Sequence, residues 1–298
     1  MRFLIAGSSG FLGTRLSEQL TSRGHEVTPL VRRPADAGEV TWDPYRKPLD
    51  PAVVDRHDFV VNLAGSPTAG NPHSKKWAED LMNSRVTTTR VLADAIAASD
   101  SLPTFLAGNG IGIYGDHGGQ PVTEMTDSRG DALLTRVSRA WQEAAEPARA
   151  AGARVCVLHT APIHDRRSEP LKALRLLFKT GLGGPIGDGS QYVPMISTRD
   201  WVDAVIHLAE TDSARGSFNL CCEKAPTNAE LTRELARLVK RPAFVRAPAF
   251  VVRRAAGPMA NEVLGSVNCV PARLLESGYD FNDPDVRAVL REGLAPSR

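Results

Sequence analysis

The chain has 298 residues, enough for one large α/β domain, alone or with a smaller appendage, and for a sizeable buried core. With 36 basic and 34 acidic side chains, it has no charge excess that would draw it to nucleic acid or to a membrane surface, so a diffusible small molecule is the expected partner. We expect no disulfide and no metal site, because neither CxxC nor Cys/His ligand spacing occurs among the four cysteines, Cys156, Cys221, Cys222 and Cys269.

Apolar segments of strand length alternate with segments of helical period in the first half of the chain. The N-terminus leads directly into an apolar strand without a signal-like segment, and no apolar run approaches membrane-spanning length, so we expect a cytoplasmic protein. This alternation predicts an α/β fold with a Rossmann-type doubly wound parallel sheet. The expected strands are residues 3–6, 27–31, 59–63, 104–107 and 155–158, and the expected helices are residues 12–23, 76–98 and 132–151.

The pattern changes after residue 160. Helices are expected at residues 172–179, 201–210 and 227–238, the last with Thr227 or Asn228 as its N-cap. The first two flank a glycine-rich segment, GLGGPIGDGSQY, at residues 181–192. We expect a sheet domain at residues 1–165, rejoined by residues 200–222, and a smaller C-terminal lobe over the carboxyl ends of the strands, made of residues 166–199 and 223–298.

Three glycines follow the first expected strand, in the sequence IAGSSGFLGTRL at residues 5–16. A strand, a tight turn and a helix N-terminus form an anion site, because backbone N–H groups and the helix dipole both point at the ligand. Gly7 suits the turn, Gly10 the close approach of a pyrophosphate, and Gly13 the packing of helix on strand. An ordinary βα turn is the alternative, but the context favours a dinucleotide site. The residues expected to bind it are Gly7, Ser9, Gly10, Phe11, Leu12 and Gly13.

The end of the second expected strand indicates which dinucleotide is bound. At this place an NAD protein usually offers a carboxylate to the ribose hydroxyls, whereas an arginine accommodates the 2′-phosphate of NADP. The sequence TPLVRRPAD offers Arg32 and Arg33, whose guanidinium groups suit a phosphate dianion. Asp36, beyond Pro34, is the competing carboxylate, and paired surface arginines are the other interpretation. We predict NADP(H) as cofactor, residues 1–165 as the NAD(P)-binding domain and the C-terminal lobe as the substrate lobe.

Further motifs follow in order along nearly the whole chain. With GSSGFLG (7–13), they resemble those of the extended short-chain dehydrogenases/reductases. The resemblance is closer to an atypical branch, the epimerase family or nucleoside-diphosphate-sugar epimerase-like proteins of the NAD-dependent epimerase/dehydratase superfamily. The motifs are VVNLAG (60–65), NSRVTTTRVLADAI (83–96), GIYG (112–115), SRAWQEAA (138–145), GLGGPIGDGSQY (181–192), TNAELTRELARLVKRPA (227–243) and VPARLLESGYDF (270–281).

This resemblance implies roles for residues outside the glycine loop. Arg85 stands where extended members usually place an Asn on the active-site helix. Asp200 matches the Asp of the family's H-x-x-D segment, with Ser197 in place of the His. Relatives are often dimers, so we expect a monomer or a homodimer. The residues expected beside the adenosine and ribose part of the cofactor are Leu63, Ala64 and Gly65.

The proton-transfer residues of a conventional member are missing. Such a member uses a Tyr and a Lys four residues later on one helix face, and a Ser near the fifth strand. None of the four tyrosines, at positions 45, 114, 192 and 279, has a Lys at that spacing. The corresponding helix reads TRVSRAWQEAA, which offers Ser138, Arg139, Trp141 and Gln142, and Asn109 stands at the serine position.

Tyr114, Asn109 and Arg85 remain as candidate catalytic residues. Tyr114 is either a hydrogen-bond donor to a substrate oxygen or a packing aromatic, and Asn109 suits positioning because an amide supplies no proton at a useful pKa. Arg85 holds an anionic substrate or the nicotinamide-side phosphate, or else forms a salt bridge within its helix. His159 is either an acid or base near neutral pH or a satisfied core histidine. Residues 183–192 are either a substrate lid or a plain surface loop.

Two functions of different classes follow from these observations. The first is an NADP(H)-binding oxidoreductase or epimerase-like enzyme that acts on a small polar substrate, with an unusual proton donor such as Tyr114 or an ordered water. The second is a non-catalytic NADP(H)-binding redox sensor or scaffold, suggested by the missing Tyr/Lys pair and by Asn109. A fold that has lost its cofactor is disfavoured, because the three glycines and Arg32 are present.

Overall fold

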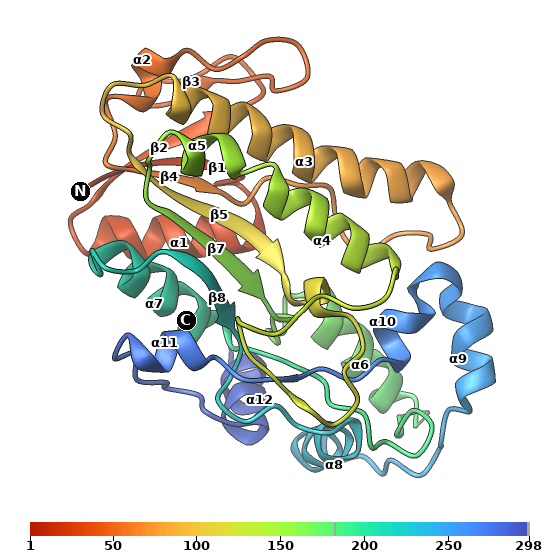
Figure 1. Ribbon diagram of the computed structural model, residues 1–298. Helices are drawn as coiled ribbons and strands as arrows, with labels where there is room; N and C mark the ends of the chain where they lie inside the picture. Colours follow the sequence, from red (N-terminus) through yellow and green to blue (C-terminus); the bar gives the residue numbers. More distant parts are fainter. Residues whose placement is uncertain (182, 297–298) are drawn as a thin grey trace.

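The computed structural model describes residues 1–181 and 183–296. A seven-stranded sheet has the order β3-β2-β1-β4-β5-β7-β8, with every neighbouring pair parallel, which confirms the predicted fold class (Figure 1). The chain moves outward from β1 to β3 and crosses back to β4, so the carboxyl ends of β1 and β4 flank the crevice where such sheets bind ligands. The strands are β1 (Arg2–Ala6), β2 (Glu26–Val31), β3 (Val40–Thr41), β4 (Phe59–Asn62), β5 (Thr104–Gly110), β7 (Val155–Thr160) and β8 (Gly216–Leu220).

The sheet is buried on both faces, which explains why its strands read as continuous apolar runs. Successive side chains of a strand point to opposite faces. Phe3 and Ile5 of β1 belong to one apolar cluster, whereas Leu4 and Ala6 belong to a second cluster on the other face. A strand buried in this way shows no polar alternation, so run length and flanking turns predict it.

Helices cover both faces of the sheet (Figure 1). Leu16, Leu20 and Trp201 are fully buried in the first cluster, and Leu92 and Ile96 are fully buried in the second. The two helices on the first face are α1 (Phe11–Ser22) and α7 (Thr198–Glu210), and those on the second are α2 (Pro51–Val54), α3 (Lys75–Ala97), α4 (Leu133–Glu143) and α5 (Glu146–Ala150).

The single helix predicted at residues 132–151 is wrong, because the structure has two helices there. The first ends at Glu143 and the second begins at Glu146. Pro147 explains the break: it has no amide hydrogen, and its ring conflicts with the carbonyl four residues earlier, that of Glu143.

β8 completes the edge of the sheet, although the sequence pattern predicts no strand there. Polar residues, Ser217 and Asn219, interrupt its apolar run. Asn219 is nevertheless fully buried, since its amide accepts a hydrogen bond from the Tyr114 hydroxyl and donates one to the Val270 carbonyl. A polar side chain is tolerated in the core when its hydrogen bonds are satisfied.

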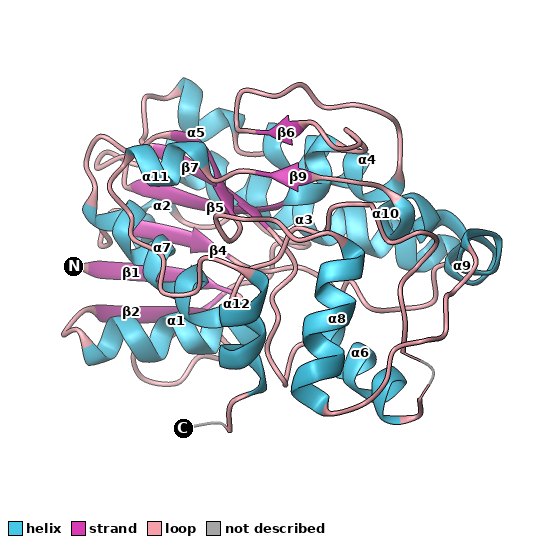
Figure 2. Cartoon of the chain, turned by 90° about the horizontal axis from the view of Figure 1, so that it is seen from below, coloured by secondary structure: helices cyan, strands magenta, loops and turns pink. Residues whose placement is uncertain are grey.

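Most of the remaining elements lie beyond the carboxyl ends of the main strands, whereas α11 (Ala272–Glu276) packs beside the edge strand β8 (Figure 2). Phe178, Leu235 and Leu290, from three different helices, are buried in a third apolar cluster. Thr227 is the N-cap of α8 and forms a capping box with Glu230. The elements are α6 (Glu169–Lys179), α8 (Asn228–Val239), α9 (Ala249–Ala256), α10 (Ala260–Leu264), α11 (Ala272–Glu276), α12 (Val286–Leu294), the 3₁₀ helices η1 (Ile111–Tyr114) and η2 (Gly257–Met259), and the strand pair β6 (Pro121–Val122) and β9 (Asn268–Cys269).

Asp200 joins α7 to the C-terminal segment. Its buried carboxylate accepts hydrogen bonds from the Tyr279 hydroxyl at 3.0 Å, from the backbone and side chain of Asn282 at 2.9 and 3.1 Å, and from the Asp283 backbone at 2.7 Å. A carboxylate with this many donors holds the segments together. In this structure the Asp of the family motif therefore has a structural role.

Candidate dinucleotide and substrate site

The glycine loop joins β1 to α1 at the point where the strand order reverses. Gly7 has φ of +83°, and a Cβ there would lie 2.7 Å from the backbone carbon of Leu63 and 2.8 Å from the backbone nitrogen of Ala64. A Cβ on Gly13 would lie 2.1 Å from the carbonyl oxygen of Gly7. The packing of the protein itself therefore requires glycine at these two positions.

Gly10 differs from the other two glycines because the protein packs less tightly around it. Its φ is −74°, and a Cβ would meet only the Gly7 carbonyl oxygen, at 3.2 Å. It is the exposed N-cap of α1, with no capping side chain, and the first turn, which begins at Phe11, contains no acidic residue. The N–H groups and the positive end of the helix dipole are thus available to an anion. Ser9, also exposed, and half-buried Leu12 complete the loop.

Arg32 and Arg33, at the end of β2, have different surroundings. The guanidinium of Arg33 pairs with Glu39 at 2.7 Å and with Asp36 at 3.0 Å. β3 brings Glu39 to this position, because Leu30 of β2 lies opposite Val40. Arg32 is exposed and forms no ion pair with any residue in the described part of the chain. The structure therefore does not offer both arginines equally to a phosphate.

Hydrogen bonds from α3 fix the loop that follows β4. Asn62 is fully buried, and its amide donates to Thr88 and Thr89 while accepting from the backbone N–H of Ala64 at 3.1 Å. Leu63 and Ala64 are half-buried, and Gly65 is exposed. Asn62 lies within the quoted motif VVNLAG, but no periodicity reveals its buried partners.

Arg85 of α3 lies against the same loop. Its Nη1 donates to the carbonyl oxygens of Ser66 and Leu81, and its Nη2 donates to the Thr68 hydroxyl, each at 3.1 Å. The guanidinium carbon is 5.1 Å from the ring centre of Trp141 in α4. Burial lowers the pKa of Arg85 to about 10. Since it pairs with no carboxylate of residues 1–181 or 183–296, it is not the salt-bridged helix arginine considered above.

Asn109 and Tyr114 are buried, and both are already hydrogen-bonded within the protein. The Asn109 amide donates to the Ser138 carbonyl and accepts from the Gly110 N–H. Tyr114 is only 2% exposed, and its hydroxyl donates to Asn219 at 2.7 Å and lies 3.0 Å from Nδ1 of His159. Burial raises the Tyr114 pKa well above its ordinary value. This placement favours the packing interpretation of Tyr114 over contact with a substrate.

His159 also belongs to the core. Its Nε2 contacts the Gln142 amide oxygen at 2.8 Å, and burial lowers its pKa to about 4, so the ring is neutral at pH 7.

The segment considered as a substrate lid, residues 183–192, is hydrogen-bonded to the rest of the protein. The Ile186 N–H donates to the Asn228 side chain, and the Tyr192 N–H donates to the Ser266 hydroxyl. Residue 182 of the same glycine-rich motif lies outside the described residues.

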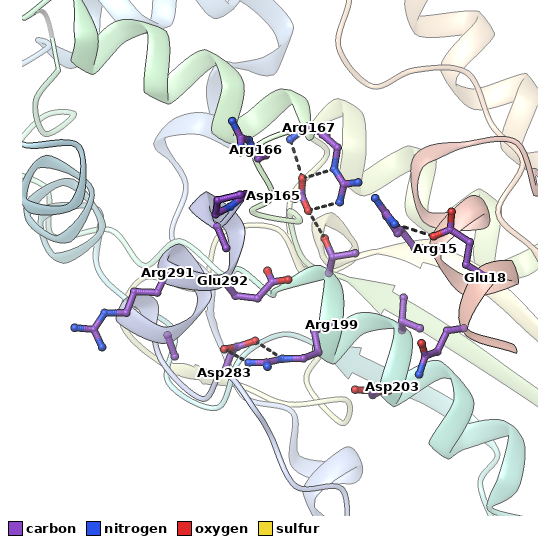
Figure 3. A pocket seen from close by; sticks show the side chains of 16 residues that line it. Arg15, Glu18, Asp165, Arg166, Arg167, Arg199, Asp203, Asp283, Arg291 and Glu292 are labelled. Atoms are coloured by element: carbon purple, nitrogen blue, oxygen red, sulfur yellow. Dashed lines mark hydrogen bonds and ion pairs between the residues drawn. The ribbon is translucent and has the colours of Figure 1, made fainter. Parts of the chain in front are cut away.

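A separate cleft of about 790 Å³ opens on the outer side of α1 and α7, beside α12 (Figure 3). None of the predicted cofactor-binding or catalytic residues lines it. Five arginines and five carboxylates line it in equal number: Arg15, Arg166, Arg167, Arg199, Arg291, Glu18, Asp165, Asp203, Asp283 and Glu292.

Most of these charges are paired within the protein. Arg15 pairs with Glu18 at 2.7 Å, Arg167 with Asp165 at 2.9 Å, and Arg199 with Asp283 at 2.8 Å (Figure 3). Glu292 is different: burial, with Asp283 and Asp165 nearby, raises its pKa to about 7. The outer cleft is thus lined mainly by charges that the protein itself pairs.

Two further predictions concern the same described residues. Neither residues 1–181 nor residues 183–296 contain a helix long and apolar enough to cross a membrane. Within those ranges, no three His, Cys, Asp or Glu side chains gather where they could hold a metal ion. The four cysteines are buried and unbridged.

A doubly wound parallel sheet with this loop at its switch point defines an α/β protein of the Rossmann type. The chain belongs to the NAD dependent epimerase/dehydratase family, whose model matches residues 3–221. A second model, a domain of unknown function (DUF1731), matches residues 247–292. The resemblance inferred from the motifs is thereby confirmed.

Relatives of known sequence and structure extend over the whole chain. An epimerase family protein of Mycobacterium leprae is 35% identical over 93% of this chain and 91% of its own length. The human epimerase family protein SDR39U1 is 31% identical over 99% of this chain and 100% of its own. Its crystal structure with NADPH has a TM-score of 0.86 at 29% identity and covers 98% of this chain and 99% of that one. A nucleoside-diphosphate sugar epimerase from Corynebacterium glutamicum has a TM-score of 0.81 at 30% identity over 99% of this chain and 58% of its own.

Proposed function

We propose that this protein is an NADP(H)-dependent oxidoreductase or epimerase-like enzyme acting on a small polar substrate. One observation carries the proposal: α1 begins at an exposed N-cap, Gly10, with no side chain that caps its N–H groups. Membership of an NAD dependent family and the NADPH in the human relative's crystal structure support it.

The residues present fit a dinucleotide. The backbone N–H groups of Phe11, Leu12 and Gly13 hold the pyrophosphate, with Gly10 and Ser9 lining its approach. Arg32 holds the 2′-phosphate, because Arg33 is already neutralised by Glu39. When bound, the nicotinamide supplies hydride transfer. The residues that run beside the ribose are Leu63, Ala64 and Gly65.

The chain's own contribution is mainly positional. Asn62 and Arg85 fix the loop after β4, and Asn109 fixes the carboxyl end of β5. Since Tyr114 is buried and bonded to Asn219, we propose that the substrate exchanges its proton with water. The same proposal includes the domain boundary at residue 165 and the C-terminal substrate lobe, of which residues 182 and 297–298 lie outside the described residues. It also includes a cytoplasmic location and a monomeric or homodimeric state.

A second candidate is a non-catalytic NADP(H)-binding sensor or scaffold. The internal hydrogen bonds of Tyr114 and Asn109 favour it, because neither group is free to touch a substrate. One experiment separates the two functions. NADPH oxidation is followed with a panel of ketones and aldehydes carrying polar groups, beside a direct measurement of NADPH binding. Steady turnover supports the enzyme, and a tightly bound cofactor that is inert across the panel supports the sensor.

A further inference from the structure

Arg85 differs from the arginines of this protein that pair with a carboxylate. Arg2, Arg33 and Arg199 each pair with a carboxylate, which raises their pKa values. The three acceptors of Arg85 are neutral: two carbonyl oxygens and the Thr68 hydroxyl. A half-buried guanidinium with only neutral partners loses hydration without gaining an opposite charge. Such a cation is stabilised most by an anion that arrives with a ligand.

The position of Arg85 places that anion near the expected cofactor. A Cβ on Gly65 would lie 3.3 Å from the Arg85 side chain, and a Cβ on Gly7 would touch Leu63 of the same loop. On the other side, a Cβ on Gly108 of β5 would lie 3.1 Å from the Trp141 ring. Arg85 and Trp141 therefore form a wall at the carboxyl ends of β4 and β5, next to the glycine loop along the sheet.

The wall also fixes the orientation of the guanidinium. Trp141 donates from its indole nitrogen to the Thr89 hydroxyl at 2.8 Å, so the ring on which Arg85 stacks is itself held by α3. A guanidinium stacked on an aromatic ring keeps its N–H edges in one plane, which suits two oxygens of one anion. Arg85 has five N–H donors and makes three hydrogen bonds to the protein, so donors remain for a ligand.

We propose that the substrate of this protein is anionic and that its carboxylate or phosphate binds to Arg85 against Trp141, beside the bound cofactor. The proposal rests on the proposed function, since it assumes a cofactor in the glycine loop. It adds a substrate class, small polar molecules that carry a carboxylate or a phosphate group. Arg85 is then a binding residue that sets specificity.

The test uses the whole protein saturated with NADP⁺, so that the pyrophosphate loop is occupied. Inorganic phosphate and acetate are titrated separately at constant ionic strength, and tryptophan fluorescence is recorded. Arg85→Gln is compared with Arg90→Gln, a control one turn further along α3 whose arginine is exposed and paired with Asp94. Trp141→Phe identifies the part of the signal that arises at the wall.

Wild type and Arg90→Gln should give the same saturable response, with a dissociation constant of about 1–10 mM. Arg85→Gln, with NADP⁺ raised until its cofactor site is saturated, should weaken that response at least about tenfold. The tighter of the two probes tells phosphate from carboxylate. No saturable, Arg85-dependent response to either probe up to about 100 mM would overturn the proposal.

Two controls keep the result interpretable. If Arg85→Gln fails to fold, Arg85→Lys keeps the cation but loses the planar fork, and about a fivefold weakening is expected from it. If wild type does not bind NADPH, the proposed function fails by itself. The titration is then made on cofactor-free Gly10→Val, in which the valine closes the glycine loop to phosphate, and the Arg85 comparison is unchanged.

Discussion

The outer cleft and the wall formed by Arg85 and Trp141 both contain arginine, but most of the charges in the outer cleft are paired within the protein. In the outer cleft, beside α1, α7 and α12, Arg15, Arg167 and Arg199 each have a carboxylate partner within the protein. At the carboxyl ends of the strands, Arg32, Arg85 and the open N-terminus of α1 have no negative partner among the described residues. We therefore expect a ligand anion at the carboxyl ends of the strands, beside these positive groups.

The largest expected effect on NADPH affinity is at the glycine loop. Gly10→Val should fold with a smaller loss of stability than a change at Gly13, because a Cβ there meets only the Gly7 carbonyl oxygen, at 3.2 Å. It should weaken NADPH binding by about 100-fold, roughly 2.7 kcal/mol, by blocking the pyrophosphate. Titration calorimetry and a melting curve check both halves. Gly13→Val is the matched variant, and its Cβ, 2.1 Å from a carbonyl oxygen, should destabilise the fold by about 2–3 kcal/mol. Equal NADPH affinity in Gly10→Val and wild type would contradict the site.

The two arginines after β2 give the next largest effect. Arg32→Ala should weaken NADPH by about 10- to 100-fold, the loss of a charge-assisted hydrogen bond, and leave NADH unchanged. Arg33→Ala should change NADPH affinity little, since Glu39 already occupies that guanidinium at 2.7 Å. Titrating both cofactors into both variants tests this assignment, and the reverse order of effects would assign the 2′-phosphate to Arg33.

A substitution of Asp200 in α7, by contrast, should affect stability but not cofactor binding. Asp200→Asn replaces a buried carboxylate that accepts from Tyr279, Asn282 and Asp283, and should lower the free energy of unfolding by about 2–3 kcal/mol. Urea denaturation measures the loss, and calorimetry of the still-folded variant should show unchanged NADPH affinity. If Asp200→Asn had wild-type stability but no longer bound NADPH, the structural role assigned to Asp200 would be contradicted.

The smallest effect concerns Glu292 and pH. Its pKa of about 7 in the folded protein exceeds the value of about 4.3 for an unfolded glutamate, so its contribution to stability is complete below about pH 4.3 and is lost as the pH rises toward and through 7. Glu292→Gln stays neutral. It should melt like wild type near pH 4.5 and about 2–4 °C higher at pH 8.

Wild type and Glu292→Gln must be compared at each pH, because other groups also titrate between about pH 4 and pH 7. The buried rings of His159 and His164 have pKa values of about 4, below the ordinary value, so their contribution is lost as the pH falls. That contribution is common to wild type and Glu292→Gln and cancels in the difference. A melting-temperature difference that does not change with pH would mean that Glu292 is not held protonated.

The sequence predicts the sheet well because its signals are local. Apolar runs of strand length and the glycine spacing need only neighbouring residues to be seen. The partners that decide each candidate's role come from far along the chain: Asn219 for Tyr114, Trp141 for Arg85, and Glu39, delivered by β3, for Arg33. Periodicity contains no information about such pairings.

The sequence also does not predict which of Arg32 and Arg33 is paired with a carboxylate. Both arginines follow one strand, and sequence alone gives no reason to separate them. β3 is only two residues long and has no apolar run, so neither the strand nor the carboxylate beside it is predicted. The missing Tyr/Lys pair, in contrast, is a property of residue type and spacing, and it is visible without a structure.

The most direct test is a calorimetric titration of the wild-type protein with NADPH and, separately, with NADH. The account predicts that NADPH binds and that NADH binds at least about tenfold more weakly, because the 2′-phosphate contacts Arg32. Binding of neither cofactor, or equal binding of both, would contradict the claim that the glycine loop and the end of β2 form one NADP(H) site.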